Sequence, residues 1–472
     1  MYLFNTLTRK KERLEPIRPG ELKIYCCGPT DYNDIHLGNA RPLVVFDSFR
    51  RYLKSLGYKV TFVQNFTDID DKVIRRAQEE QLSYQEIAER YIQAYRVACE
   101  ALNVQPADVE PRATDKIPEI LSMIEALIER GHAYVAEDGV YFSTKSDPNY
   151  GQLSGYHLDE LTQDAGGREV SSDQKQDAAD FALWKFKKPG EPAWPSPWGE
   201  GRPGWHIECS AMVRAELGDT IDIHCGGKDL IFPHHENEIA QSTCCTGHPL
   251  ARYWMHNGHV NVNHSKMSKS AGNFFTVKDL LETYDGMVLR FFILSGHYRS
   301  PIDFSRELLD ASKRAWERIQ VCVRNLRFAL EGFKADTAIS REDKLDPAWC
   351  EKIQVQEEAY QAALADDFNT AQAMGALFNM VKELNQALSE HRDPKLLDRG
   401  LERLLSCLQV LGLDPERERE QGVPAEIETM AKARDQARKE KNWAEADRLR
   451  DAIQQAGWVI EDTPQGAKLY RA

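Results

Sequence analysis

Residues 21–67 read ELKIYCCGPTDYNDIHLGNARPLVVFDSFRRYLKSLGYKVTFVQNFT, and this stretch decides the fold. Residues 21–28 begin with alternating polar and apolar side chains and contain residues that favour β-structure, so they predict a strand. Apolar residues at near-helical spacing follow in residues 41–56, and Gly57 ends that helix. Residues 58–65 predict a second strand. We therefore expect a strand, a helix and a second strand in succession.

A second predicted helix extends this pattern. Residues 67–80 have helical periodicity, and Thr67 or Asp68 is a plausible N-cap because its oxygen can accept from a free backbone N–H. Alternating strands and helices are typical of a parallel, doubly wound sheet. The sequence therefore predicts an α/β, Rossmann-like domain.

A change of composition marks an insertion into this sheet. The last part of residues 145–204 carries five prolines and four glycines in KKPGEPAWPSPWGEGRPGW, which excludes a helix interior. We expect the sheet to resume with the strand-like segments HIECSAM (206–212) and DIHCGGKDLIF (222–232).

Long helical periods dominate from residue 306 onward. One apolar helix face is formed by Met374, Leu377, Phe378, Val381, Leu384 and Leu388. A charged break with two prolines, residues 413–424, separates a last module at 425–472.

Size and composition indicate a globular protein. At 472 residues the chain is long enough for about three domains. It has no apolar run of about 18 residues, which would be needed to span a membrane, and no signal peptide is recognisable. Its ten cysteines contain no CxxC pair, so we expect reduced, cytosolic cysteines. The net charge of −14 neither favours nor excludes RNA binding, which would need local basic patches.

The tetrapeptide His36-Leu37-Gly38-Asn39 lies where the first strand gives way to a helix. Ligands bind at this edge of a parallel sheet, and a helix N-terminus offers N–H groups to phosphate. Gly38 permits close approach of adenine or ribose, and His36 can donate to developing phosphate charge. The alternative is an ordinary turn histidine.

The segment Lys266-Met267-Ser268-Lys269-Ser270 follows the strand-like HVNVN. Two lysines on a loop of small residues, Lys266 and Lys269, can neutralise a triphosphate. The alternative is an exposed basic loop. The sequence has no Walker-type GxxxxGK[ST] and no GxGxxG motif for this role.

Four scattered residues are candidate metal ligands. His234 and Glu238 are four residues apart in a predicted helix and so share a face. Cys27 ends the first predicted strand, and Cys209 follows the strand-like GWHIE. One nitrogen, one oxygen and two sulfur ligands suit tetrahedral zinc. Buried cysteines, a buried histidine and a solvated glutamate are the alternatives, and the segment lacks the HExxH motif of metalloproteases.

These segments together resemble a known family. HLGN is similar to the His-Ile-Gly-His motif of class I aminoacyl-tRNA synthetases, and KMSKS matches their second motif letter for letter. CGPT, NFTDIDDK, EPRAT, GWHIECSAM, GGKDLIFPHHENEIAQS, YWMHNGHV and SGHYRSPIDF resemble cysteinyl-tRNA synthetases in particular. One departure is Asn39, which stands where the general motif has a second histidine. An amide can donate a hydrogen bond there but carries no charge.

The resemblance implies a domain organisation. It comprises a class I catalytic domain in two halves (1–120 and 201–250, the second with the zinc site), a connective insertion (121–200), a stem-contact region with the KMSKS loop (251–305), a helical bundle (306–412) and an anticodon-binding module (425–472).

The resemblance also implies a function, the attachment of L-cysteine to cysteine tRNA with ATP, and its site residues. It implies one zinc per chain, held by Cys27, Cys209, His234 and Glu238. It implies ATP, with Mg²⁺, at His36, Gly38, Asn39, Lys266 and Lys269, of which all but Gly38 would be catalytic. Thr67, Trp205 and Asp229 would line the cysteine pocket. We expect a cytoplasmic protein without membrane contact, and a monomer.

Two other functions stay open at this stage. A ligase joining cysteine to an amino sugar would share the catalytic body but should lack residues 425–472. A zinc-dependent RNA-binding protein without activity would have no need of His36, Lys266 and Lys269.

Overall fold

The computed structural model describes most of the chain. The described residues are 1–156, 175–262, 265–266, 274–335, 347–390, 393–417, 425–456, 458–463 and 466–471. They divide into two compact units, the first formed by Met1–Trp316, Gln354–Asn379 and Ser406–Leu413 and the second by Glu317–Ile353, Met380–Leu405 and Asp414–Ala472. None of the described helices has the length and apolar character needed to cross a membrane.

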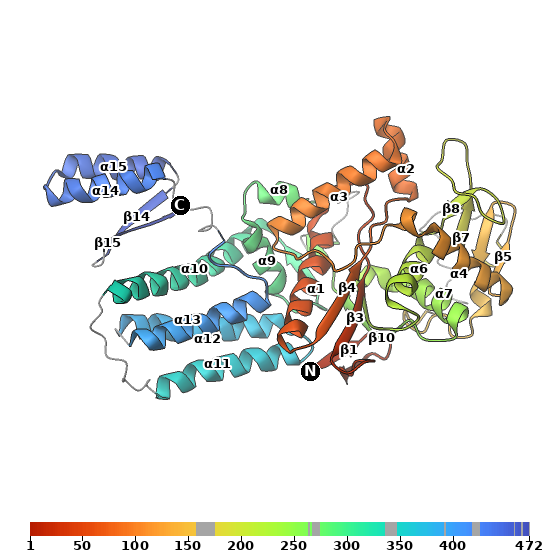
Figure 1. Ribbon diagram of the computed structural model, residues 1–472, viewed down its shortest axis with the longest axis horizontal. Helices are drawn as coiled ribbons and strands as arrows, with labels where there is room; N and C mark the ends of the chain where they lie inside the picture. The colour runs from red at the N-terminus through yellow and green to blue at the C-terminus, as the bar shows by residue number, and fades with distance from the viewer. Residues whose placement is uncertain are drawn as a thin grey trace. The chain divides into compact units, whose positions relative to one another are not determined.

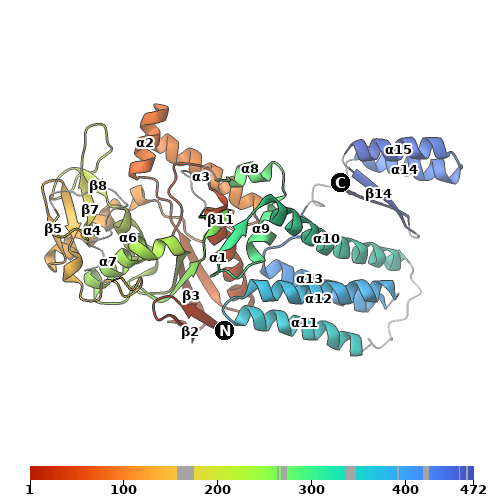
Figure 2. The same ribbon diagram turned by 180° about the vertical axis from the view of Figure 1, so that it is seen from behind.

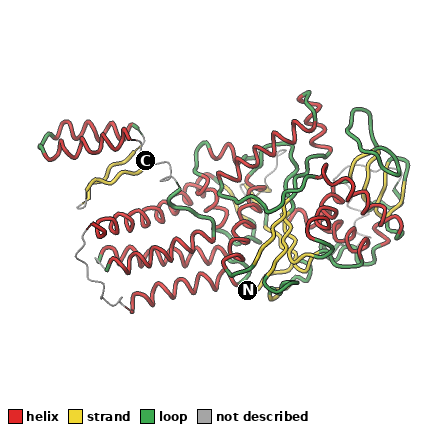
Figure 3. The backbone as a smooth tube through the Cα atoms, in the orientation of Figure 1, coloured by secondary structure: helices red, strands yellow, loops and turns green. Residues whose placement is uncertain are grey.

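A four-stranded parallel sheet, ordered β10-β9-β3-β4, organises the first unit (Figures 1 and 3). Its strands are β3 (Glu21–Cys26), β4 (Lys59–Gln64), β9 (Ile221–Gly227) and β10 (Ala251–Asn257). The crossover from β3 to β4 contains α1 (Leu37–Ser55), and that from β9 to β10 contains α7 (Glu236–Thr246). The two crossovers lead away from each other, so the strand order reverses between β3 and β9. Ligands bind at such a switch point.

The sheet is buried on both faces, as parallel sheets require. On one face of the sheet, Ile24 of β3 pairs in register with Phe62 and Ile223, and all three side chains are buried. The next residue of β3, Tyr25, points to the opposite face and is buried as well. Helix α1 covers one face, and α6 (Trp205–Leu217) and α7 lie on the other side (Figures 1 and 2). The predicted doubly wound sheet is confirmed.

One predicted strand is a helix. HIECSAM lies inside α6, which begins after Gly204 and ends at Leu217. Seven consecutive side chains of this helix, from Ile207 to Val213, are buried. A helix buried on nearly all sides loses the one-sided apolar pattern that would distinguish it from a buried strand. The prediction was therefore wrong for this segment. Of the second predicted segment, DIHCGGKDLIF, only DIHCGG lies in β9, whereas KDLIF lies in the helical turns η3 (Lys228–Leu230) and η4 (Ile231–His235).

The second predicted helix begins later than expected. Helix α2 (Asp71–Glu80) has Asp70 as its N-cap, and the Asp70 side chain accepts from Lys72 N at 2.8 Å. The prediction of Thr67 or Asp68 was wrong because residues 67–69 are still part of the loop after β4.

The insertion forms a small domain within the first unit. Helix α4 (Ile117–Glu129) packs on an antiparallel sheet in the order β5-β6-β7-β8. Its strands are β5 (Ala133–Val135), β6 (Gly139–Phe142), β7 (Phe181–Phe186) and β8 (Gly201–Pro203). Ile207 and Ala211 of α6 belong to the same apolar core, so the insertion and the catalytic sheet share that helix.

The remaining elements complete the first unit. They are β1 (Tyr2–Asn5), β2 (Lys10–Arg13), α3 (Tyr84–Ala101), η1 (Ala113–Lys116), η2 (Thr144–Ser146), η3 (Lys228–Leu230), η4 (Ile231–His235), β11 (Val260–Val262), β12 (Ser265–Lys266), α8 (Val277–Leu281), α9 (Gly286–Leu294) and β13 (Ile302–Phe304). Strand β11 pairs with both β12 and β13 in a three-stranded sheet, which we call the small sheet.

The predicted helical region is present. It comprises α10 (Arg306–Ala335), α11 (Pro347–Ala365), α12 (Thr370–Ser389) and α13 (Pro394–Val410), which run alongside one another in both views (Figures 1 and 2). Of the predicted apolar face on α12, Met374, Leu377, Val381 and Leu384 are buried, whereas Phe378 and Leu388 are half-buried.

The last module consists of a helical hairpin and a β-hairpin in the second unit. Its elements are α14 (Ala425–Lys439), α15 (Trp443–Gln455), β14 (Trp458–Thr463) and β15 (Gly466–Arg471). Ile427, Ala431 and Ile453 form its buried core, against which Trp458 packs.

Candidate metal centre and nucleotide site

Four side chains meet at the switch point of the sheet. Cys27 directly follows β3, and Cys209 lies in the second turn of α6. His234 lies in η4, and Glu238 lies in the first turn of α7. Their ligand atoms lie within 4.8 Å of one another, and all four residues are buried. The structure thus brings together the four residues that the resemblance implied as metal ligands.

The separations between the donor atoms fit a tetrahedral zinc site. Cys27 Sγ lies 3.9 Å from Cys209 Sγ and 3.5 Å from Glu238 Oε1. His234 Nε2 lies 3.1 Å from the same Glu238 oxygen. Zinc bonds of about 2.0–2.3 Å place neighbouring tetrahedral ligand atoms roughly 3.3–3.8 Å apart. Two thiols, an imidazole and a carboxylate also match the ligand types of zinc.

Burial shapes the charges of this cluster. It raises the pKa of the Cys27 thiol well above its ordinary value, and the neighbouring Cys209 raises it further. Burial lowers the pKa of His234 to about 3, so its imidazole is neutral. Burial alone would raise the pKa of Glu238, but His224 and His234 outweigh it and the net change is downward. A neutral imidazole and an ionised carboxylate are the forms in which His234 and Glu238 would coordinate a metal.

A second set of donors overlaps the first. Cys27, His224, His235 and Glu238 also have ligand atoms within 4.8 Å of one another. His224 Nε2 lies 2.8 Å from Glu238 Oε2, and His235 Nε2 lies 3.3 Å from Cys27 Sγ. We favour the set that contains Cys209, because two thiols bind zinc more strongly than one. His224 then orients Glu238 from outside the metal.

The residues of the tetrapeptide 36–39 form the start of α1. His36 is the N-cap, its Nδ1 accepts from Asn39 N at 3.0 Å, and Asn39 Oδ1 accepts from His36 N at 3.3 Å. Because Nδ1 accepts, a neutral His36 carries its proton on Nε2. Asn39 therefore also has a structural role in the cap, which sequence reasoning missed.

Gly38 makes this arrangement possible. A Cβ at Gly38 would lie 2.7 Å from Cε1 and 2.9 Å from Nδ1 of His36. Any larger residue would displace the His36 ring from the helix start. The structure thus supplies a reason for glycine that does not depend on the expected approach of a nucleotide.

The expected cysteine-pocket residues follow carboxyl ends of strands or begin α6. The Trp205 ring stacks on His234, with centroids 4.2 Å apart and planes at 27°. Thr67 is buried after β4, and its Oγ1 accepts from Asn65 Nδ2 at 3.2 Å. Asp229 is exposed in η3, directly after β9. Trp205 therefore adjoins the metal cluster, whereas the cysteine-binding roles of all three stay predictions.

A close approach of two loops positions Thr67. Gly28 N donates to Asn65 Oδ1 at 2.9 Å, and a Cβ at Gly28 would lie 1.9 Å from Asn65 O. Only glycine fits there, so the turn after Cys27 and the loop carrying Thr67 are held side by side. Sequence reasoning missed Asn65.

Of the KMSKS segment (266–270), the described residues include only Lys266. Lys266 belongs to β12, where its backbone pairs with Asn261 of β11. Residues 267–273, which include Lys269, lie outside the described residues. Their expected ATP contacts stay predictions.

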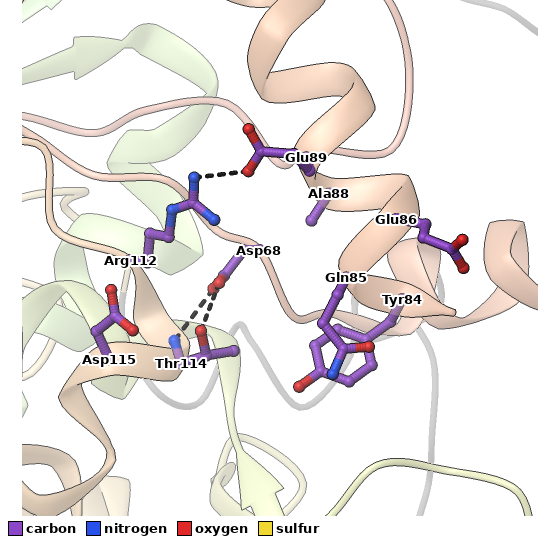
Figure 4. A pocket seen from close by; sticks show the side chains of 9 residues that line it. All are labelled: Asp68, Tyr84, Gln85, Glu86, Ala88, Glu89, Arg112, Thr114 and Asp115. Carbon is purple, nitrogen blue, oxygen red and sulfur yellow. Dashed lines mark hydrogen bonds and ion pairs between the residues drawn. The ribbon is translucent and has the colours of Figure 1, made fainter. Parts of the chain in front are cut away.

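An open pocket of about 500 Å³ lies beside the loop after β4 (Figure 4). Asp68 accepts there from Thr114 N at 3.1 Å, and Arg112 is paired with Glu89 at 2.8 Å. Its lining contains four carboxylates and one guanidinium, which disfavours a triphosphate. The lining residues are Asp68, Tyr84, Gln85, Glu86, Ala88, Glu89, Arg112, Thr114 and Asp115.

Family models match nearly the whole chain. The catalytic domain of class I (C) tRNA synthetases matches residues 13–314, the DALR domain residues 359–414, and the cysteinyl-tRNA ligase anticodon binding domain residues 420–470. The cysteine–tRNA ligase of Symbiobacterium thermophilum is 51% identical over 100% of this chain and 99% of its own. That of Caldicellulosiruptor saccharolyticus is 48% identical over 100% of both chains.

The chain belongs to the cysteine–tRNA ligase family. Solved structures of other class I synthetases share the fold of this chain. Methionyl-tRNA synthetase of Mycobacterium tuberculosis, with methionyl-adenylate, has a TM-score of 0.61 at 15% identity and covers 83% of this chain and 89% of its own. A LeuRS of Agrobacterium radiobacter K84, in a ternary complex, has a TM-score of 0.61 at 12% identity and covers 84% and 85%.

Sequence reasoning did not identify several histidines that surround the candidate metal cluster. His206 Nδ1 lies 2.9 Å from His234 Nδ1, and His235 Nδ1 lies 2.8 Å from His256 Nε2. Their position could have indicated a role at the site, because His224, His235 and His256 lie in or next to segments at the switch point of the sheet. Their mutual contacts depend on the tertiary fold, which spacing along the chain does not encode.

Proposed function

We propose that the chain activates L-cysteine with ATP and transfers the cysteinyl group to the 3′ end of cysteine tRNA. The observation that carries this proposal is the buried cluster of two thiols, an imidazole and a carboxylate at the switch point of a class I sheet. A site of that composition suits an amino acid whose side chain is itself a thiol.

The reaction has two steps. A carboxylate oxygen of cysteine forms a bond to the α-phosphorus of ATP, the bond to the bridging oxygen breaks, and pyrophosphate leaves. The terminal ribose hydroxyl of tRNA then attacks the cysteinyl carbonyl, loses its proton, and AMP leaves. No protein nucleophile is needed, so catalysis rests on positioning and charge stabilisation.

The chain's own residues supply both. His36 Nε2 donates toward the phosphates from the start of α1, where the helix dipole also favours negative charge. Asn39 fixes the His36 ring through the cap described above. Lys266 and Lys269 neutralise the charge that develops as pyrophosphate leaves. Mg²⁺ accompanies ATP as it does in phosphoryl transfer generally.

Cysteine selection is assigned to the buried cluster. Cys27, Cys209, His234 and Glu238 would hold one zinc ion, which when bound supplies a soft Lewis acid that prefers sulfur to oxygen. Trp205 covers the His234 side of this cluster. Thr67 and Asp229 would bind the polar groups of the amino acid.

We also propose a cytoplasmic, monomeric enzyme. The assignment to the cytoplasm rests on ten cysteines without a regular disulfide framework. Light scattering on the purified chain tests the monomer, which should have a mass of about 53.9 kDa.

The ligase that joins cysteine to an amino sugar is not favoured. It should lack the last module, whereas residues 420–470 of this chain match an anticodon-binding domain. The RNA-binding protein without activity is disfavoured by the match to a catalytic domain.

The direct test is aminoacylation. The purified chain should attach labelled cysteine to cysteine tRNA in an ATP-dependent reaction and should not attach it to glucosamine-type acceptors. Transfer to the amino sugar alone would overturn the proposal.

A further inference from the structure

Arg41 is a buried cation near the start of α1, two residues after Asn39. Its side chain is 0% exposed. Nη1 donates to His259 O at 2.8 Å, and Nη2 donates to His297 O at 3.1 Å and to Ser300 O at 2.5 Å. One guanidinium therefore joins α1 to two loops more than 200 residues away, as the separations of 218, 256 and 259 residues show.

This contact is unusual because the Arg41 charge has no counterion among the residues that the structure describes. Within the described part of the chain Arg41 is paired with no carboxylate, and its Nε has no partner. Burial lowers the pKa of Arg41 to about 10, which keeps the group charged at neutral pH. By contrast, the equally buried Arg290 is paired with Asp47 at 2.6 Å. Burial of an unpaired charge is costly, so purely structural stabilisation is a weak reason for this arginine.

The three carbonyls lie in the loops that precede β11 and β13, two strands of the three-stranded sheet β12-β11-β13. His259 immediately precedes β11 and also accepts from Ile302 N of β13 at 3.0 Å. Strand β11 packs beside α1 (Figure 2) and pairs with β12, whose second residue is Lys266. Arg41 therefore fixes the strands next to Lys266 against the helix that begins with the His36 cap.

A second connection to the start of α1 is made by residues that follow the KMSKS segment (266–270). Leu37 N donates to Phe275 O at 3.1 Å, and Val277 N donates to Ile35 O at 2.9 Å. The His36 ring makes an edge contact with Phe274, with centroids 5.0 Å apart. The chain is thus fixed to the His36 region shortly before and shortly after residues 263–273.

We infer that Arg41 is a positioning residue for adenylate formation, which holds the strand of Lys266 in register with His36 and Asn39. This inference rests on the proposed function, in which these residues act together on the phosphates of ATP. Arg41 itself touches no substrate. A displacement of about 1 Å between two catalytic groups can cost roughly 100-fold in rate.

The test compares matched substitutions of two equally buried arginines. Arg41→Lys and Arg41→Met are measured beside Arg290→Lys and Arg290→Met, since Arg290 donates its hydrogen bonds to other parts of the unit, namely Asp47, Ser48, Leu102, Asn103 and Leu411. Zinc content, urea unfolding and cysteine affinity are determined for each. Single-turnover adenylate formation and transfer from preformed cysteinyl-adenylate to tRNA are then measured separately. If Arg41→Met does not fold, Arg41→Lys decides, because it keeps the charge.

We expect the Arg41 variants to form adenylate about 10- to 100-fold more slowly. Cysteine affinity and the transfer step should stay within about twofold of wild type, because pyrophosphate has already left before transfer. The Arg290 variants should be less stable but keep the adenylation rate when folded. Unchanged adenylation in Arg41→Lys, or an equal loss in both steps or in both arginine series, would overturn the inference. Absence of any cysteine-dependent adenylate in wild type would instead refute the proposed function.

Discussion

Glu238 connects the members of the candidate metal site. One of its carboxylate oxygens lies near Cys27 and His234, and the other lies near His224. We predict that Glu238→Gln lowers zinc affinity at least tenfold, because a neutral amide replaces an anionic ligand. Zinc content after dialysis, measured by mass spectrometry, should fall from about one per chain.

Glu236 provides a matched control for this experiment. It is equally buried on the same helix, but its carboxylate accepts from backbone N–H groups, including Ser154 N at 2.7 Å. Glu236→Gln should retain zinc. If Glu238→Gln also retained about one tightly bound zinc, Glu238 would not be a ligand.

We predict strong selection of cysteine over serine in adenylate formation. The two amino acids differ by one atom, and a soft metal site discriminates sulfur from oxygen. A pocket built around a specific polar contact can discriminate by about 10⁴ or more. The ratio of kcat/KM for adenylation of the two amino acids measures this. Similar values for serine and cysteine would show that the cluster does not select the substrate.

The sequence identified some of the residues of the candidate site but not others. The four cluster residues were identified through family resemblance, since positions 27, 209, 234 and 238 follow no regular ligand spacing. Arg41 gave no signal, because an arginine in an amphipathic helix is ordinarily solvated. Its contacts with His259, His297 and Ser300 arise only once the chain has folded.

At the scale of elements, α1 and α9 are joined by a buried ion-pair network. Asp47 on α1 lies 2.6 Å from Arg290 on α9 and 2.9 Å from Arg50. We predict that Asp47→Asn lowers the free energy of unfolding by about 3–5 kcal/mol, because it leaves buried guanidinium groups without their carboxylate. Urea unfolding measures this loss. Glu21→Gln removes the exposed pair with Lys59 and should change stability little.

The same network predicts a dependence on pH. Burial would raise the pKa of Asp47, but Arg290, Arg51 and Arg50 outweigh it and the net change is downward. Its contribution is therefore complete above the unfolded pKa of about 3.9 and is lost as the pH falls through the lower folded value. The stability difference between wild type and Asp47→Asn should shrink below about pH 4. A difference that stays constant down to pH 3 would contradict this assignment.

Elements with a clear strand or helix periodicity were predicted best. The strands β3 and β4 and the helix α1 followed from their periodicities, although the N-cap of α2 was misplaced by two or three residues. Helix α6 was mistaken for a strand, because burial of residues from Ile207 to Val213 removes the amphipathic signal. The sequence alone could not distinguish these cases.

At the scale of the whole molecule, the order of strands and helices was enough to predict the parallel sheet. It could not predict that the switch point would gather the histidines, since β9 and β10 come late in the chain. The predicted domain bounds remain predictions.

The last module is predicted to serve tRNA charging but not cysteine activation. Deletion of residues 425–472 should leave pyrophosphate exchange largely intact and strongly reduce charging. Within this module, Trp443 is 59% exposed, whereas Arg434 is 5% exposed and Trp458 packs on the module's core. Trp443→Ala in the full chain should therefore weaken charging, because a stacked base contributes about 1–3 kcal/mol.

Both steps must be measured on each of these variants. Equal loss of exchange and charging in the truncated protein would mean that the module is structural. Unchanged charging would mean that tRNA is recognised elsewhere. Ile453→Ala, at a buried position of the same module, serves as a control for general destabilisation.

The most direct test of the account is cysteine-dependent exchange of labelled pyrophosphate into ATP by the full-length, zinc-loaded chain. The proposed function predicts exchange that requires cysteine and Mg²⁺, proceeds without tRNA, and is lost when Cys27 or Cys209 is replaced by serine. Exchange that is absent with cysteine would contradict the proposed function, and exchange that persists unchanged in both serine variants would contradict the claim that this buried cluster binds the cysteine that is activated.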